Sequence, residues 1–263
     1  MITMKITQDI VYDSGNDLKL DTYAPDTKPK ATLLLIHGGG WFRGDKEKES
    51  FLAEKFVNEG FFVVAPNYRL APADLYPSAL TDVFNAYAWT KKNTLAANMP
   101  IFALGASAGG NLAVELALQK GIPTASWSGI IDMYDWVTQH PEVKAVMNKE
   151  QHFDAHESRE IDQDGNNDQF YKWFILNYVR NDLNLLKSAT PLTRVSSKSG
   201  PVFLANSLHE LVPISGVLKL QQALADVDVP SDVKLIAGTV HGEGYWELAL
   251  PQTLSFFSSY LAN

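Results

Sequence analysis

Short apolar runs that alternate with helical segments are the feature that most narrows the fold of this chain. Residues 31–36 (ATLLLI) and 61–65 (FFVVA) are continuous apolar runs, typical of strands buried on both faces of a parallel sheet. The segment between them, 46–59, carries apolar residues at helical spacing and is followed by a glycine. Strand and helix in alternation predict a mostly parallel sheet covered by helices on both faces.

The same alternation continues along the rest of the chain. Before it, residues 1–30 alternate polar and apolar side chains around a Ser-Gly-Asn-Asp turn, which predicts an antiparallel hairpin at a sheet edge. Residues 133–189 break the rhythm, because this segment is long, acidic in its middle and predicted to be helical only at its end. We interpret it as a cap-like insertion over the carboxyl edge of the sheet. The further expected elements are helices near 78–93, 109–119, 215–226 and 244–261, and strands near 101–104, 125–130, 202–205 and 232–237.

Composition limits the class of protein. With 46% hydrophobic residues, a chain of 263 residues can bury one large core, so we expect a single domain over residues 1–263. The net charge of -8 argues against nucleic acid or an anionic membrane as a partner. Neither a signal-peptide pattern nor an apolar run of about 18 residues is present, so we expect a cytoplasmic protein. Cysteine is absent, which excludes disulfides, thiolate metal sites and cysteine nucleophiles.

The strongest chemical motif is Gly105-Ala106-Ser107-Ala108-Gly109, a G-x-S-x-G that lies between an apolar strand (IFAL) and a helical run (NLAVELAL). This context predicts a nucleophile elbow, a sharp strand-to-helix turn that presents a reactive serine. Small neighbours are required because the backbone passes close on both sides. The amide of Ala108, at the start of the helix, can point at a developing oxyanion.

A second motif, His37-Gly38-Gly39-Gly40-Trp41, directly follows the strand at 31–36 and matches the glycine-rich oxyanion loop of lipases and esterases. Its glycines allow backbone amides to face a carbonyl oxygen. A phosphate-binding loop is the competing interpretation, but neither glycine-rich phosphate signature follows. His37 is expected to be a buried hydrogen-bonding residue that shapes this loop and not a base.

Together, these motifs resemble those of the hormone-sensitive-lipase-like carboxylesterases of the α/β-hydrolase superfamily, in their compact bacterial form. The likeness covers most of the chain and rests on HGGGW, NYRLAP, YPSAL with a following aspartate, GASAGG and a late His-Gly pair. The resemblance implies an α/β-hydrolase fold and a metal-free acyl transfer on small uncharged esters. It also implies oxyanion donors from Gly39, Gly40 and Ala108.

His241 is the expected general base. It follows the apolar run KLIAGTV, and the loop after the last strand is where the base of such a hydrolase lies. The other histidines are in the insertion, before the oxyanion glycines, or on an earlier loop.

The acid that should orient His241 is the one member of the catalytic triad that the sequence does not identify. The family pattern has an aspartate four residues before a proline, whereas this chain has His209 at that position. Loss of such a carboxylate lowers turnover by about four orders of magnitude in serine proteases. Three interpretations stay open: Glu210 supplies the acid from a shifted loop, Asp132 supplies it from the end of an earlier strand, or the acid is absent.

The remaining predictions concern the pocket and bound groups. Trp41, Tyr134 and Trp246 are candidates for lining a substrate pocket, although such aromatic residues also build cores. The histidines and aspartates at 152–168 are residue types that can bind metal ions, but they lack the spacing of a calcium loop. We therefore expect no metal and no cofactor.

The sequence therefore predicts a serine carboxylesterase that acts on small, short-chain acyl esters through an acyl-enzyme. Two rival functions stay open. HGGGW also resembles arylformamidases, which would make the enzyme an amide hydrolase, and the histidine at the acid position favours a small-molecule binding protein that has lost turnover. A homo-oligomer is left open.

Overall fold

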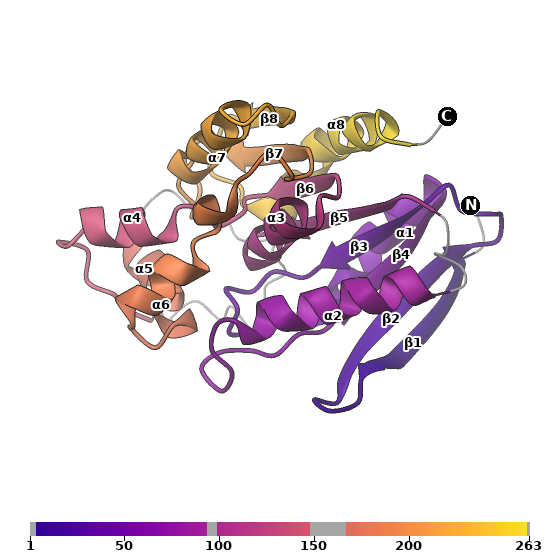
Figure 1. Cartoon of the computed structure of the whole chain (residues 1–263), viewed down its shortest axis with the longest axis horizontal. Helices are drawn as coiled ribbons and strands as arrows, with labels where there is room; N and C mark the ends of the chain where they lie inside the picture. Colours follow the sequence, from indigo (N-terminus) through magenta and orange to yellow (C-terminus); the bar gives the residue numbers. More distant parts are fainter. Residues whose placement is uncertain (1–3, 94–98, 148–166, 262–263) are drawn as a thin grey trace.

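A single eight-stranded sheet organises the computed structural model, which describes residues 4–93, 99–147 and 167–261 (Figure 1). Its strand order is β1-β2-β4-β3-β5-β6-β7-β8. The first two strands form the predicted antiparallel hairpin, β2 is antiparallel to β4, and all later pairs are parallel. The strands are β1 (Met4–Asp13), β2 (Leu18–Pro25), β3 (Ala31–Ile36), β4 (Phe61–Pro66), β5 (Ile101–Ala106), β6 (Thr124–Trp127), β7 (Val202–Ser207) and β8 (Ser231–Ile236).

Helices cover both faces of this sheet, as the alternating pattern predicted. In β3, Leu34 and Ile36 belong to the core on the side of α2 and α3, whereas Leu33 and Leu35 belong to the core on the side of α1 and α8. Each fully buried leucine contributes about 1.5–3 kcal/mol through the hydrophobic effect. The helices are α1 (Ser50–Asn58), α2 (Ser78–Lys92), α3 (Ala108–Lys120), α4 (Met133–Gln139), α5 (Asp168–Tyr178), α6 (Leu183–Ala189), α7 (Ser215–Ala225) and α8 (Trp246–Ser258), with short 3₁₀ turns η1 (Lys46–Glu49), η3 (Pro191–Arg194) and η4 (Gly242–Tyr245).

The insertion at 133–189 differs in part from its prediction. It begins with a helix, α4, and contains α5 and α6, which lie beside α4 at one end of the molecule (Figure 1). The short α4 escaped prediction because it spans only seven residues, yet Met133, Trp136 and Val137 are spaced to bury one face. Most of the acidic middle, including the histidines and aspartates of 152–164, lies outside the described residues.

Two element boundaries also differ from prediction for local reasons. The strand expected at 125–130 ends at Trp127, because Ser128 has a φ of +51° and turns the chain out of the extended conformation. The last helix begins at Trp246, two residues later than expected, because residues 242–245 form a 3₁₀ turn.

Parallel pairing brings the ends of the central strands to a common edge. Ser107 directly follows β5 and Ser128 directly follows β6. Glu210 lies three residues beyond the last residue of β7, and His241 follows β8 by five residues. Because carboxyl ends of parallel strands meet at one edge, these four side chains are gathered although they are far apart in sequence. Among the helices of the described residues, none is long and apolar enough to cross a bilayer.

Candidate active site

Ser107 occupies a sharp turn between β5 and α3. Its backbone has φ +56° and ψ −121°, a conformation that L-residues rarely adopt, and its amide donates to the carbonyl of Trp127 at 2.8 Å. The neighbouring glycines are sterically required. A Cβ on Gly105 would lie 2.2 Å from the carbonyl oxygen of Gly109, and one on Gly109 would lie 2.1 Å from that of Ile36. The turn therefore has the geometry of a nucleophile elbow.

The glycine loop after β3 lies beside this serine. Gly39 and Gly40 have φ values of +114° and +59°, and a Cβ on Gly39 would meet the Arg43 carbonyl oxygen at 2.1 Å. Across the described residues, no protein acceptor takes the amide N–H of Gly39, Gly40 or Ala108. These three donors are thus available to a ligand oxygen, which is the requirement for an oxyanion hole.

His37 packs against this glycine loop and helps to fix its shape. Its ring stacks on Tyr68 with a centroid separation of 4.1 Å, and its Nδ1 donates to the carbonyl of Gly38 at 2.8 Å. The Tyr68 hydroxyl donates to the carbonyl of His37 itself at 2.9 Å. Burial lowers the pKa of His37 to about 4, so the ring is neutral at physiological pH. His37 thus has the buried hydrogen-bonding surroundings expected from the sequence.

His241 and Glu210 form a buried pair. The Nδ1 atom of His241 donates to Oε2 of Glu210, and both side chains are nearly inaccessible to solvent. The other carboxylate oxygen, Oε1, accepts the amide of Ser207 and the hydroxyl of Ser128, each at 2.8 Å. With three donors on one carboxylate, Glu210 is fixed in rotation, and the Nε2 edge of His241 is left for a second partner.

Neither His209, at the family's acid position, nor Asp132, the alternative acid, makes this contact. His209 is exposed, and its amide donates to the carbonyl of Gly238 at 3.0 Å. Asp132 instead accepts from the Lys219 ammonium at 2.8 Å and from the Ser215 hydroxyl at 3.4 Å. Of the candidate acids, the structure brings Glu210 to His241 and joins Asp132 to α7.

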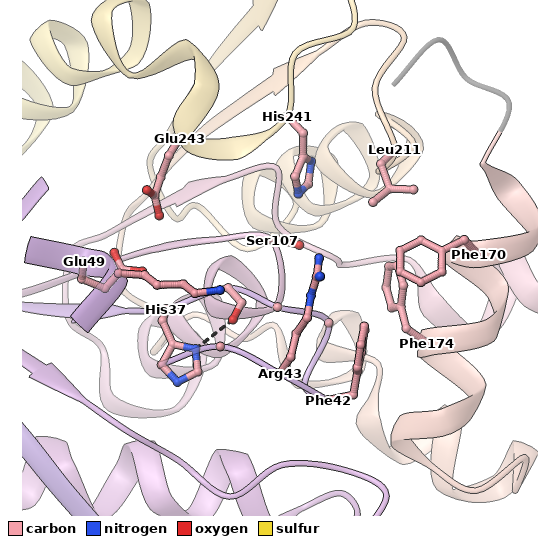
Figure 2. Close-up of a pocket in the computed structure, with 15 residues that line it drawn as sticks. His37, Phe42, Arg43, Glu49, Ser107, Phe170, Phe174, Leu211, His241 and Glu243 are labelled. Carbon is pink, nitrogen blue, oxygen red and sulfur yellow. Dashed lines mark hydrogen bonds between the residues drawn. The ribbon is translucent and has the colours of Figure 1, made fainter. Parts of the chain in front are cut away.

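Ser107 and His241 line one cavity together with Gly38, Gly39 and Gly40. Figure 2 shows the imidazole of His241 pointing toward the hydroxyl of Ser107 from the opposite wall. The volume of this cavity is about 40 Å³. The arrangement places a nucleophile, a base and backbone donors around a space in which a carbonyl group could lie.

The walls of the cavity differ in chemistry. One side is apolar and is made by Phe42, Phe170, Phe174 and Leu211, as Figure 2 shows. The opposite side carries Glu49 and Glu243, whose carboxyl groups face one another (Figure 2). Burial and the neighbouring charge of Glu243 raise the pKa of Glu49 well above its ordinary value, which favours a proton on this pair.

The aromatic residues predicted to line the pocket do not line this cavity. Trp41 is fully buried and stacks on Tyr178 at 4.3 Å, because its φ of +60° turns the indole into the core. Tyr134 lies on α4 beside Lys187, and Trp246 packs edge-on against Phe51 at 5.3 Å. The lining residues missed from the sequence have one detectable signal: Phe170 and Phe174 are four apart on a helix and share a face.

Comparison with known proteins identifies a family and several relatives. The BD-FAE family model matches residues 20–224. Versiconal hemiacetal acetate esterase of Aspergillus parasiticus is 33% identical over 158 residues, which are 59% of this chain and 49% of that protein. This chain therefore spans about half the length of that relative.

Solved structures share the fold. An esterase of Pyrobaculum calidifontis superposes with a TM-score of 0.76 at 21% identity, covering 98% of this chain and 86% of the other. A truncated carbohydrate esterase from gut microbiota gives 0.73 at 15% identity, covering 98% and 96%. The predicted α/β-hydrolase fold is confirmed, as is the resemblance to hormone-sensitive-lipase-like carboxylesterases. Because the family model matches more than half of its length, the chain belongs to the BD-FAE family.

Proposed function

We propose that the protein is a serine hydrolase that cleaves small, uncharged carboxylic esters with short acyl chains. The observation that carries this proposal is the buried contact between His241 and Glu210, with the imidazole facing the cavity that Ser107 lines. An oriented base beside a serine at an elbow is the arrangement that nucleophilic acyl transfer requires.

The chemistry follows from these positions. His241 takes the hydroxyl proton at Nε2 as Ser107 Oγ bonds to the ester carbonyl carbon, and the amides of Gly39, Gly40 and Ala108 bind the negative oxygen that forms. Collapse of this intermediate breaks the bond to the alcohol, which leaves with the proton from the imidazolium. Water then attacks the acyl-enzyme by the same route, returning the acid and free Ser107. Throughout, the Glu210 carboxylate accepts a hydrogen bond from Nδ1–H of His241 and stabilises the imidazolium charge.

The size and chemistry of the cavity support the choice of substrate. A cavity of about 40 Å³ suits an acetyl or similarly short group, and the phenylalanines of its apolar wall favour an uncharged one. We therefore expect kcat/KM to fall from acetyl to butyryl to octanoyl esters of one chromogenic alcohol.

The test compares these esters with an N-formyl aromatic amine, using wild type and Ser107→Ala. The proposal predicts ester turnover with a burst of released alcohol, covalent labelling by a fluorophosphonate, and loss of both in Ser107→Ala. A preference for the formyl amide would favour the arylformamidase-like function instead. Absence of labelling at neutral pH would favour the binding-protein function instead. The contact between Glu210 and His241 argues against that function, because a missing acid was the reason to consider it. Cytoplasmic location and a homo-oligomer stay predictions.

A further inference from the structure

Ser128 is a buried serine that touches both partners of the candidate catalytic pair. It follows β6 and is fully buried. Its hydroxyl donates to Oε1 of Glu210 at 2.8 Å and accepts the amide N–H of Gly242, the residue after His241, also at 2.8 Å. The hydroxyl of Tyr245 lies 2.7 Å away. One oxygen atom thus joins the loops that follow β6, β7 and β8.

The backbone of Ser128 has a positive φ, which is strained for any residue other than glycine. Ser128 has a φ of +51°, where glycine is favoured, and its amide is held by the carbonyl of Ala205 at 2.8 Å. A glycine would adopt this conformation without penalty but would lack the hydroxyl. The presence of a side chain at a strained, buried position therefore points to a use for its oxygen.

We propose that Ser128 is a positioning residue that holds Glu210 and the His241 loop in register for proton transfer. This role rests on the proposed hydrolase function. Ser128 does not reach the reacting atoms, because it acts through the carboxylate of Glu210 and the amide of Gly242.

The hydrogen-bond inventory explains why such a residue is needed. A glutamate has one more rotatable bond than the aspartate of the family pattern, so its carboxylate has more orientations to lose. An ionised carboxylate accepts only, and the donors on Oε1 from Ser128 and Ser207 leave Oε2 directed at His241. Without the Ser128 hydroxyl, one donor on Oε1 is lost, the carboxylate can turn away from the imidazole, and the amide of Gly242 loses its acceptor.

Two substitutions test the role while separating it from backbone strain. Ser128→Ala and Ser128→Gly both remove the hydroxyl, but only the glycine relieves the positive φ. We expect kcat to fall about 10-fold to 100-fold in both, the loss typical of one hydrogen bond to a charged group, with KM little changed. The matched control is Thr124→Val, which removes a buried hydroxyl from the other end of the same strand, where it donates to the carbonyl of Ile122. That variant should keep wild-type kcat.

A double-mutant cycle shows whether Ser128 acts through the acid. In a Glu210→Gln background, adding Ser128→Ala should lower kcat by less than about 3-fold, because the charge that it positions is already gone. Independent losses that multiply would contradict the proposal. So would a wild-type kcat in Ser128→Gly, since this variant lacks the hydroxyl while its backbone adopts the positive φ without strain.

A readout without turnover keeps this inference distinct from the proposed function. The Nδ1 proton of His241, bonded to a carboxylate, should give a low-field proton resonance that disappears in Glu210→Gln and shifts or broadens in Ser128→Ala and Ser128→Gly. If Ser107 is never acylated but the resonance responds in this way, the hydrolase proposal fails while the positioning of Glu210 stands. An unchanged resonance and unchanged kcat in both Ser128 variants would overturn the positioning role.

Discussion

The identity of the acid gives the sharpest test of the site. Glu210→Gln preserves the length of the side chain, and its amide oxygen can still accept from Ser207 and Ser128. The remaining NH₂ group would face Nδ1 of His241, where a donor meets a donor. The substitution therefore removes the negative charge from a buried site and favours the wrong imidazole tautomer, with little change in volume.

The expected loss follows from these two effects. In serine proteases, removing this charge while keeping the geometry lowers kcat by about 10⁴-fold, so we expect a loss of about 10³-fold to 10⁴-fold here. At about 1.36 kcal/mol for each factor of ten, the transition state loses about 4–5.5 kcal/mol. The matched control, Asp132→Asn, removes a carboxylate that accepts from Lys219 and not from His241, so it should leave kcat unchanged.

Burst kinetics with a chromogenic acetyl ester separate the outcomes. We expect a slower burst in Glu210→Gln at unchanged melting temperature, and wild-type bursts in Asp132→Asn. A Glu210→Gln enzyme within 10-fold of wild type, or an inactive Asp132→Asn, would refute the assignment of Glu210 as the acid.

Three further predictions concern other parts of the site. The pKa of Glu49 is raised in the folded state, so above about pH 4.5 the unfolded state binds fewer protons than the folded state. The free energy of unfolding therefore falls as pH rises from about 4.5 to the raised pKa. Thermal unfolding across this window should show the loss in wild type and a flatter profile in Glu49→Gln. Gly109→Ala places a Cβ 2.1 Å from the Ile36 carbonyl oxygen, so urea unfolding should show a loss of about 1–3 kcal/mol together with slower fluorophosphonate labelling. His209→Asp, at an exposed position, should leave kcat within a few-fold of wild type, and a large gain would show that the native acid is inadequate.

Much of the fold was predictable because it depends on long, regular patterns. Apolar runs such as 31–36 and 61–65 can be buried only inside a sheet covered on both faces, and the intervening helices fix a parallel connection. The role of Ser107 was equally predictable, since the elbow needs small residues at fixed positions. The short α4 and the early end of β6 depend on single side chains and on one positive φ, which periodicity does not report.

The walls of the cavity were harder to predict because they depend on where side chains point after the layers assemble. Trp41 and Phe42 are adjacent in sequence, yet the first packs into the core against Tyr178 and the second lines the cavity. The deciding factor is the positive φ of Trp41, which follows from the tight glycine loop and not from the aromatic residue itself. Likewise, Glu49 meets Glu243 only because η1 and η4 approach one another across the fold.

The acid illustrates how a sequence pattern can fail while the physical requirement behind it is met. The family pattern specifies a residue position, but the imidazole requires only a carboxylate oxygen at Nδ1. Moving the acid from position 209 to 210 changes the direction of the side chain, and the additional methylene of glutamate changes its reach. The loop after β7 accommodates both changes, because Oε1 is held by the Ser207 amide and the Ser128 hydroxyl while Oε2 meets His241. The substitution of glutamate for aspartate therefore depends on one donor from the end of β7 and one from the residue after β6, so grafting His-Glu alone into a relative that lacks a hydroxyl at the position of Ser128 should not restore an oriented base.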